Sequence, residues 1–437
     1  MTLLVISPDY ASHLLPLATL ATAWTDAAEN VVVATGPATE PLVHRFGFRR
    51  VDLPLGRGAN AGVIRAEDQV TEEADSLAGF FAATRRGMVE TLTYQARERL
   101  TDLMWDPVGR AQATRRVVEQ VAPSAILVDH LAFGARLALH TAGIPYADVV
   151  LGHPTALPVG DEVYGYPPSW PSTLSADAGS LEALRAICDE VSSRFTAQWN
   201  TAAAELDPDA TPVADAFRLH GETVLYNYPA ELAKGDGRVL PPHVFLGSAQ
   251  RVEPRDGEVE SWLAVDEPFV YVSLGSFLSV RDDVLARLAE ALRALHSATG
   301  IRAAIASGST PMERLGPVPE SWLVREYLPQ VRLLSRARAA VTHGGNNSVT
   351  EAVGQGVPLL VLPMSTDQFA GAAALERTGL GVAADPNAAG PDELRSALET
   401  LCADDFAGRA PLAAIAEGQR RAPGAHRAFE AVTGTTR

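Results

Sequence analysis

Short apolar runs alternate with stretches of helical periodicity along the N-terminal part of the chain. The runs at residues 3–7, 31–35 and 49–53 have the length and composition of buried strands. Between them, residues 14–28 and 38–46 carry apolar positions at helical spacing. Strands that alternate with helices in this way pair in parallel, through crossover connections. The pattern therefore predicts an α/β fold with a doubly wound parallel sheet.

The alternation continues along the rest of the chain. Residues 154–171 interrupt it, because they are rich in proline, glycine and aromatic residues and predict irregular structure. The other predicted strands lie at 125–128, 146–151, 223–226, 269–273, 301–306, 323–326, 338–342 and 359–362. The other predicted helices lie at 72–105, 109–120, from 132, at 181–204, 281–297 and 346–353, and from about 408.

A break in the pattern divides the chain into two series of strands and helices. Pro241 and Pro242 are followed by the charged, glycine-containing residues 250–260. This composition is typical of a linker between domains. We predict an N-terminal domain at 1–245, a linker at 246–262, a C-terminal domain at 263–410 and a helical tail at 411–437.

Composition narrows the functional class. Of 437 residues, 47% are apolar and 20% are charged, as in folded globular proteins. The net charge of −17 argues against a nucleic acid polymer or an anionic membrane as partner. The two cysteines match no metal-ligand spacing, and the N-terminus lacks the basic region of a signal peptide. No apolar run has the length of a membrane span, so we expect a soluble, cytoplasmic protein.

Missing motifs exclude further classes. Lys234 is the only lysine, and it lies in a Gly/Asp-rich loop. This argues against a Walker-type phosphate loop and a lysine Schiff base. No G-x-S-x-G elbow is present, which argues against an α/β-hydrolase.

Residues 327–368 contain the densest set of candidate chemistry. His343-Gly344-Gly345 follows a predicted strand and precedes a predicted helix, so unpaired N–H groups and the helix dipole favour an anion there. His343, Asn347 and Ser348 can add donors around one phosphate. Glu351 lies one turn further along, where we expect it to accept bonds from sugar hydroxyls beside the phosphate. H-G-G alone is more typical of an ordinary connection between a strand and a helix, but the whole stretch argues against that interpretation.

The motifs of this stretch occur in a characteristic order. They are Tyr327-Leu328-Pro329-Gln330, then His343-Gly344-Gly345-Asn346-Asn347-Ser348 with Glu351, then Gly356-Val357-Pro358, then Asp367-Gln368. They resemble the nucleotide-sugar signature of the inverting glycosyltransferases of family 1, W-x-P-Q, H-x-G-x-N-S-x-x-E, G-V-P and D-Q. That family includes plant secondary-product and bacterial antibiotic glycosyltransferases. Tyr327 replaces the usual tryptophan and keeps an aromatic face on which a base can stack.

The resemblance implies a GT-B fold, in which two Rossmann-like doubly wound domains face each other across a cleft. The N-terminal domain would bind the acceptor, and the C-terminal domain would bind the nucleotide sugar. The donor-binding residues implied by the resemblance are Ser276, Tyr327, Leu328, Gln330, His343, Gly345, Asn347, Ser348, Glu351, Asp367 and Gln368. Ser276 matches a G-S element that contacts the diphosphate. Asp367 and Gln368 match a pair that binds the hydroxyls of the transferred sugar, although Asp367 is also suited to plain helix capping.

His13 and Asp129 are the candidate catalytic residues. In isolation, His13 is typical of a surface or capping histidine. The family, however, carries its general base at G-H-x-x-P, which His13 and Pro16 match with Ser12 in place of glycine. Asp129 ends the strand at 125–128 and matches the acidic partner of the base. A carboxylate there would fix the imidazole tautomer and stabilise the imidazolium, and Asp129 can also cap a helix.

Candidate acceptor-binding residues follow other predicted strands or lie in the irregular segment. We expect His130 and His153 to line the pocket. Tyr164, Tyr166 and Trp170 lie within residues 154–171, and such aromatic rings suit flat or apolar ligands. The alternative is that these rings pack the segment onto its own domain.

These observations and the resemblance predict an inverting transferase. It would move a hexose, and specifically glucose, from a UDP-sugar to a hydroxyl group of a small molecule. We expect this acceptor to be a bacterial secondary metabolite. Glu351 suits a ribose with both hydroxyls, which thymidine diphosphate sugars lack. The alternatives are a dTDP-deoxysugar transferase of antibiotic biosynthesis, a nucleotide-sugar epimerase and a non-catalytic nucleotide-sugar sensor. We recognise no metal-binding carboxylate cluster in the sequence, so we predict no metal and no cofactor other than the UDP-sugar co-substrate. We expect a monomer or homodimer.

Overall fold

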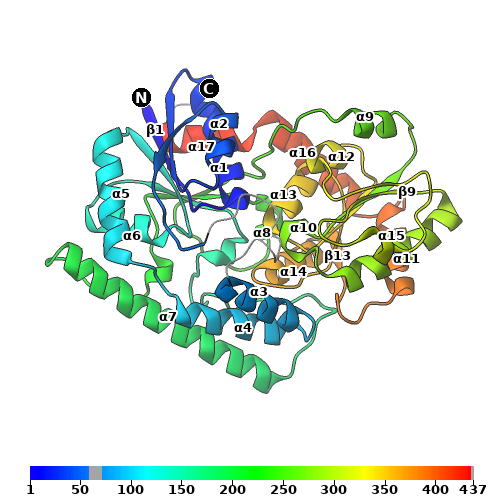
Figure 1. Ribbon diagram of the computed structural model, residues 1–437, viewed down its shortest axis with the longest axis horizontal. Coiled ribbons are helices and arrows are strands. Elements are labelled where there is room, and N and C mark those ends of the chain that lie inside the picture. Colours follow the sequence, from blue (N-terminus) through cyan, green and yellow to red (C-terminus); the bar gives the residue numbers. More distant parts are fainter. Residues whose placement is uncertain (59–70, 435–437) are drawn as a thin grey trace.

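The computed structural model has two α/β domains, each built on a parallel sheet (Figure 1). It describes residues 1–58 and 71–434, and at residues 71–74, 276 and 277 it describes the backbone alone. This arrangement confirms the predicted pair of doubly wound, parallel-sheet domains.

The N-terminal sheet has the strand order β3-β2-β1-β4-β5-β6-β7, and every pairing is parallel. Apolar residues fill its central strands because helices cover both faces. Its strands are β1 (Thr2–Ile6), β2 (Asn30–Thr35), β3 (Arg49–Asp52), β4 (Ala125–Asp129), β5 (Ala147–Val150), β6 (Thr223–Tyr226) and β7 (His243–Phe245). Its helices are α1 (Ala11–Asp26), α2 (Glu40–Arg45), α3 (Thr71–Thr84), α4 (Met88–Thr101), α5 (Pro107–Val121), α6 (Phe133–Thr141), α7 (Ala178–Leu206) and α8 (Ala230–Ala233), with short 3₁₀ turns at Pro154–Ala156 and Ala216–Arg218.

The C-terminal sheet has the order β10-β9-β8-β11-β12-β13, again with parallel pairings throughout. Its strands are β8 (Phe269–Ser273), β9 (Arg302–Ala306), β10 (Leu323–Arg325), β11 (Ala339–Thr342), β12 (Leu359–Val361) and β13 (Gly381–Ala383). The helices of this half are α9 (Gly257–Leu263), α10 (Gly275–Leu278), α11 (Asp282–Thr299), α12 (Gln330–Leu334), α13 (Asn346–Gly354), α14 (Gln368–Thr378), α15 (Pro391–Cys402), α16 (Arg409–Arg421) and α17 (Gly424–Thr433), with a 3₁₀ turn at Met312–Leu315.

Each sheet reverses its direction of winding at one point. In the N-terminal sheet the chain runs to β2 on one side of β1, and β4 pairs on the other side. In the C-terminal sheet, β9 and β11 flank β8 in the same way. Connections leave the two neighbouring strands in opposite directions at such a point, so a crevice opens at their carboxyl ends. The candidate catalytic and phosphate-binding residues follow these strands.

Several predicted boundaries were wrong for local reasons. Helix α1 begins at Ala11, before the predicted start at residue 14, so His13 lies in its first turn. The predicted helical region at 72–105 is two helices, because Gly87 has φ +134° at the start of α4. The sequence reading also missed β7, β13, α9, α12 and α15, and the linker predicted at 246–262 contains most of α9.

The last helix returns to the N-terminal domain. Helix α16 packs on α13, whereas α17 packs on α1 at the opposite side of the domain junction (Figure 1). Phe429 joins the apolar core beneath β1, where its ring meets the Trp24 ring edge to face at 5.1 Å. Within the described residues, no helix is long and apolar enough to cross a membrane.

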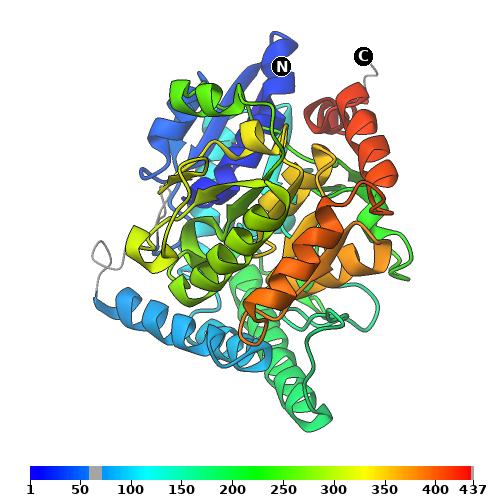
Figure 2. The same ribbon diagram turned by 90° about the vertical axis from the view of Figure 1, so that its right-hand side faces the viewer.

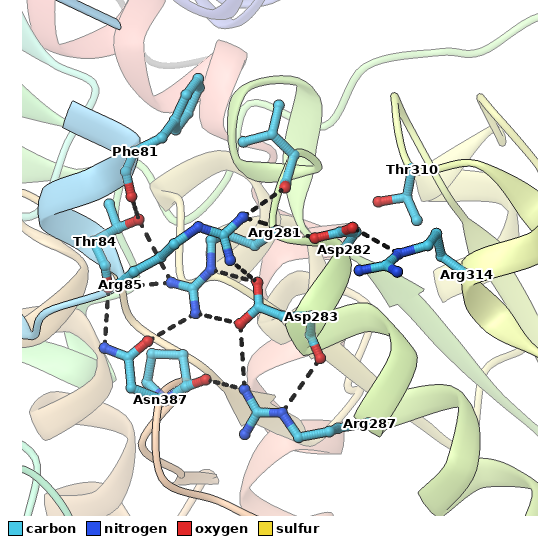
Figure 3. A network of polar contacts seen from close by, with 12 residues as sticks. Phe81, Thr84, Arg85, Arg281, Asp282, Asp283, Arg287, Thr310, Arg314 and Asn387 are labelled. Carbon is cyan, nitrogen blue, oxygen red and sulfur yellow. Dashed lines mark hydrogen bonds and ion pairs between the residues drawn. The ribbon is translucent and has the colours of Figure 1, made fainter. Parts of the chain in front are cut away.

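A buried arginine links α3 to the C-terminal domain (Figure 3). Arg281 is 1% exposed, and its guanidinium donates to both carboxylate oxygens of Asp283 at 2.8 Å. It also donates to the Thr84 carbonyl at 3.1 Å and to Asn387 Oδ1 at 2.7 Å. The Asn387 amide donates to the same Thr84 carbonyl at 3.0 Å. The carboxyl end of α3 is therefore capped by side chains of the other domain.

Candidate active site

The structure brings His13 and Asp129 together at the switch point of the N-terminal sheet. His13 lies in the first turn of α1, after β1, and Asp129 is the last residue of the neighbouring β4. The His13 Nδ1–H donates to Asp129 Oδ2 at 2.8 Å, while Asp129 Oδ1 accepts from the Leu131 N–H at 2.8 Å. Asp129 is 1% exposed and the His13 side chain 26%. The bond on Nδ1 leaves Nε2 as the ring nitrogen that can accept a proton.

The surroundings of His13 favour its protonated form. Burial alone lowers the pKa of His13, but the charge and hydrogen bond of Asp129 and the charge of Asp367 outweigh it, so the net pKa is raised. Asp367 belongs to the C-terminal domain. The imidazole therefore feels carboxylates from both domains, which suits a group that must become positively charged during a reaction.

Two glycines shape the space around His343 at the switch point of the C-terminal sheet. A Cβ atom at Gly275 would lie 2.6 Å from His343 Cε1, and one at Gly345 would lie 2.5 Å from Nε2. Gly275 also has φ +74°. Only glycine fits on either side of this ring. Burial lowers the pKa of His343 to about 4, so the ring is neutral at physiological pH and offers one N–H donor.

The helix that follows His343 makes contacts across the domain junction. Gly345 caps the N-terminus of α13. The Asn346 amide donates to the carbonyls of Leu151 at 2.7 Å and Asn227 at 2.9 Å, and the Asn347 amide donates to the Ser12 carbonyl at 3.0 Å. The segment predicted to bind the diphosphate is thereby held next to the backbone that precedes His13.

Asp367 reaches across the same junction. Its Oδ2 accepts from the backbone N–H of His153 at 2.5 Å, and a Cβ at Gly152 would lie 2.7 Å from that oxygen. Thr366 precedes it at φ +48°, an unfavourable conformation for a β-branched residue. Burial raises the pKa of Asp367, with the His153 N–H opposing the effect. The strained backbone at Thr366 thus presents a desolvated carboxylate towards His13.

Gln368 and Ser276 complete the predicted sugar and diphosphate contacts. Gln368 Oε1 accepts from the N–H groups of Met364 at 2.9 Å and Ser365 at 3.1 Å, so its amide closes the loop after β12. Ser276 lies in the short helix α10 after β8, and its side chain is outside the described part of the chain. The assignment of both residues to the donor stays a prediction.

The predicted nucleoside contacts gather at α13 and the loop before α12. Glu351 is 3% exposed, and its Oε2 accepts from Gln330 Nε2 at 2.6 Å. Gln330 Oε1 lies 3.4 Å from Ser348 Oγ. Tyr327 is 61% exposed, and the Leu328 side chain is buried in the core. The exposed Tyr327 ring leaves a face free for a base, whereas Leu328 has only its backbone to offer.

His130 and His153 lie close to the His13–Asp129 pair, but their side chains contact residues that stabilise the fold. His130 is 1% exposed, and its Nδ1 lies 3.7 Å from Asp148, which Arg136 binds at 2.9 Å. Burial lowers the pKa of His130. His153 caps the following 3₁₀ turn, and burial lowers its pKa to about 3. It is the backbone N–H of His153 that reaches the site.

The three candidate aromatic residues are engaged in packing. Tyr164 stacks on Phe217 with ring centroids 3.9 Å apart in the core of the N-terminal domain. Tyr166 meets Trp170 edge to face at 5.9 Å, and Trp170 lies 5.9 Å from Phe369 of α14. The Tyr164 contact matches the packing alternative, whereas Trp170 packs against the C-terminal domain. Their assignment to the acceptor stays a prediction.

Sequence reasoning missed two residues of the site. Asn346 was read as part of the motif without a role, although its amide bridges the domains. Arg251 was placed in the linker, yet its Nη1 lies 3.5 Å from Glu351 Oε1. The only signal for Arg251 was an arginine among the charged residues of a segment that has to run between the domains. In the described residues, no group of three His, Cys, Asp or Glu side chains is arranged to hold a metal ion.

Comparison with known families places this geometry in context. Residues 187–410 match the model of the family described as UDP-glucoronosyl and UDP-glucosyl transferase, which spans half of the chain and includes every motif from β8 to α14. The chain belongs to this family. The resemblance inferred from residues 327–368 is therefore confirmed.

Relatives in the family match the chain over different lengths. The 4'-demethylrebeccamycin synthase of Lentzea aerocolonigenes is 26% identical over 396 residues, covering 87% of this chain and 86% of that protein. An uncharacterized UDP-glucosyltransferase of Bacillus subtilis, YojK, is 46% identical over 67 residues, covering 15% of this chain and 16% of that protein. A second one, YdhE, is 30% identical over 128 residues, covering 29% and 31%. The chain thus matches less than a third of the length of these two relatives.

Solved structures share the fold along the whole chain. The glycosyltransferase of kitacinnamycin superposes with a TM-score of 0.65 at 22% identity, covering 98% of this chain and 97% of that one. Glycosyltransferase VinC in complex with dTDP also has a TM-score of 0.65, at 19% identity, covering 99% and 98%. At these identities the likeness shows the fold alone.

Proposed function

We propose that this protein is an inverting glycosyltransferase that moves glucose from UDP-glucose to a hydroxyl of a small, partly apolar acceptor, a bacterial secondary metabolite. His13 Nε2 takes the proton of the acceptor hydroxyl. The acceptor oxygen forms a bond to the anomeric carbon while the bond from that carbon to the diphosphate oxygen breaks. The electron pair of the broken bond leaves with UDP, and the single displacement inverts the anomeric centre.

The observation that carries the proposal is the His13–Asp129 hydrogen bond, which lies opposite Asp367 across the domain junction. Asp129 holds the tautomer in which Nε2 is free and stabilises the imidazolium that forms. His343 and the N-terminus of α13 supply neutral donors for the departing diphosphate, whose charge grows as the bond breaks. We propose that no metal takes part, so EDTA should leave the rate unchanged.

The proposed donor rests on two carboxylates. Glu351 suits a ribose that carries both hydroxyls, and Asp367 suits a hexose rich in hydroxyls. Loss of a substrate hydroxyl leaves such a group unpaired, which costs about 1–3 kcal/mol. A dTDP-deoxysugar donor is the second candidate, because VinC, which shares the fold, was solved with dTDP.

The test is UDP release from UDP-glucose with polyphenols, macrolides, nucleosides and sugars as acceptors. His13→Ala should lower turnover by at least ~10²-fold with little change in donor affinity. His44→Ala is the matched control, because His44 is exposed in α2. Undiminished turnover in His13→Ala would refute the base assignment. Sugar epimerisation without acceptor would identify an epimerase, binding without turnover a sensor, and preference for dTDP-deoxysugars the second candidate.

A further inference from the structure

A buried charged cluster joins the interdomain linker to the nucleoside side of the donor site. Arg251 Nε donates to Glu253 Oε1 at 3.1 Å, and Arg251 Nη1 lies 3.5 Å from Glu351 Oε1. Glu253 Oε2 accepts from the Arg332 backbone N–H at 3.1 Å, which fixes the linker to the first turn of α12. The Arg251 side chain is 17% exposed and that of Glu351 4%, so this contact is largely removed from solvent.

Glu351 is held from two sides. Gln330 binds Oε2 at 2.6 Å, while Arg251 approaches Oε1. Burial raises the pKa of Glu351, and the positive charge of Arg251 acts against that rise. Each carboxylate oxygen has two lone-pair sites, so Oε1 can still accept a further hydrogen bond. Arg251 therefore orients the carboxylate and favours its ionised form without using up its acceptor capacity.

The Arg251 guanidinium also has N–H groups that make no hydrogen bond within the described residues. It has five N–H bonds, and its Nη2 makes no hydrogen bond within the part of the chain that the structure describes. The guanidinium and the Glu351 carboxylate, whose Nη1 and Oε1 atoms are 3.5 Å apart, thus lie near the exposed Tyr327 ring. A hydroxyl both donates and accepts one hydrogen bond, so one hydroxyl can satisfy both groups.

We propose that Arg251 is a specificity-determining residue that, with Glu351, reads the ribose 2′-hydroxyl of the donor nucleotide. The hydroxyl donates to Glu351 Oε1 and accepts from the guanidinium. A 2′-deoxyribose leaves a carboxylate and a guanidinium without their partner, so it binds more weakly. The inference rests on the proposed function only in that the ligand is a nucleotide sugar, and it adds the residue by which ribonucleotides are selected over deoxyribonucleotides.

The experiment compares the binding of UDP and dUDP, which differ only at the 2′ position, to the full chain by titration calorimetry. Wild type should bind UDP at least ~10-fold more tightly, the worth of a hydrogen bond to a charged group. In Arg251→Met this ratio should fall below ~3-fold, through weaker UDP binding with dUDP little changed. Arg251→Lys keeps the charge and loses the fork, so its ratio should lie between the two.

Arg332→Met is the matched control. The Arg332 side chain pairs with Glu260 at the surface, and its contact with Glu253 is made by the backbone, so the ratio should match wild type. The pH profile gives a second measurement. Without Arg251, Glu351 should take up a proton at higher pH, so UDP affinity in Arg251→Met should fall more steeply below neutral pH than in wild type.

Two results would overturn the inference. One is equal affinity of wild type for UDP and dUDP, and the other is an unchanged ratio in a folded Arg251→Met. Neither result touches the transfer reaction, which the His13 variants test separately. A folded wild type that binds neither nucleotide would overturn this inference and the proposed donor together.

Discussion

Removal of the Arg281 guanidinium tests whether α3 is held by the C-terminal domain. Arg281→Met keeps most of the side-chain volume and deletes the hydrogen bonds to Asp283, Asn387 and the Thr84 carbonyl. We expect the last turn of α3 to open more readily, because its carbonyl loses a charged cap and α3 loses a link to the other domain.

The magnitude follows from what remains after the substitution. Breaking a buried ion pair costs about 3–5 kcal/mol when a charge is left alone. Here Asp283 is 35% exposed and retains its ion pair with Arg85 at 2.6 Å. The Thr84 carbonyl retains its hydrogen bond from the Asn387 amide. We therefore expect about 2–3 kcal/mol, below that range. This corresponds to roughly 30- to 150-fold faster exchange of protected amides in α3, if exchange follows local opening.

Hydrogen exchange followed by mass spectrometry is the assay, because local opening in a two-domain protein is not captured by one unfolding midpoint. Arg314→Met is the control: Arg314 pairs with Asp282 at 2.8 Å but is 58% exposed, so exchange in α3 should not change. Protection of α3 that is equal in wild type and Arg281→Met would refute the capping argument.

Three further predictions concern the site. Asp129 and Asp367 raise the pKa of His13 above its usual 6.5, so kcat/KM should rise with pH through an inflection above 6.5. In Asp129→Asn the inflection should move to lower pH and the rate should fall. An inflection that does not move would have to be assigned to another group. Gly345→Ala should weaken UDP binding by at least ~10-fold in a folded protein, since its Cβ would displace His343; calorimetry that shows wild-type affinity would mean that His343 does not contact the diphosphate. Tyr327→Ala should cost about 1–3 kcal/mol of UDP binding through lost base stacking, whereas Tyr327→Trp should retain affinity; equal affinities for all three proteins would exclude stacking there.

Most of the fold could be predicted from local sequence patterns. The strands β1, β2, β8 and β11 are short apolar runs that helices cover on both faces, so composition alone located them. The signature between Tyr327 and Gln368 also depends on local order, because one strand–turn–helix unit holds most of its residues. For that reason the family could be recognised from the sequence alone.

Two kinds of feature could not be predicted from the sequence alone: a break within a helical pattern and contacts between distant segments. The break between α3 and α4 depends on Gly87, but a helical pattern runs on both sides of it. The role of Arg251 needs the linker to pass beside α13, and no local pattern records that path. The His153 N–H reaches Asp367 across 214 positions of sequence, so a search for side-chain chemistry could not find it.

The return of α17 to the N-terminal domain means that the chain passes between the domains twice. The two passages touch: a Cβ at Gly424 would lie 2.8 Å from the Leu246 carbonyl oxygen, and one at Gly247 would lie 2.7 Å from Gln419. Figures 1 and 2 place α16 and α17 at one end of the molecule and α3 at the other. Two adjoining tethers permit rotation about the line on which they lie and resist twisting and sliding. Any separation of the domains would then be widest at the contact between α3 and Arg281 and smallest beside the tethers.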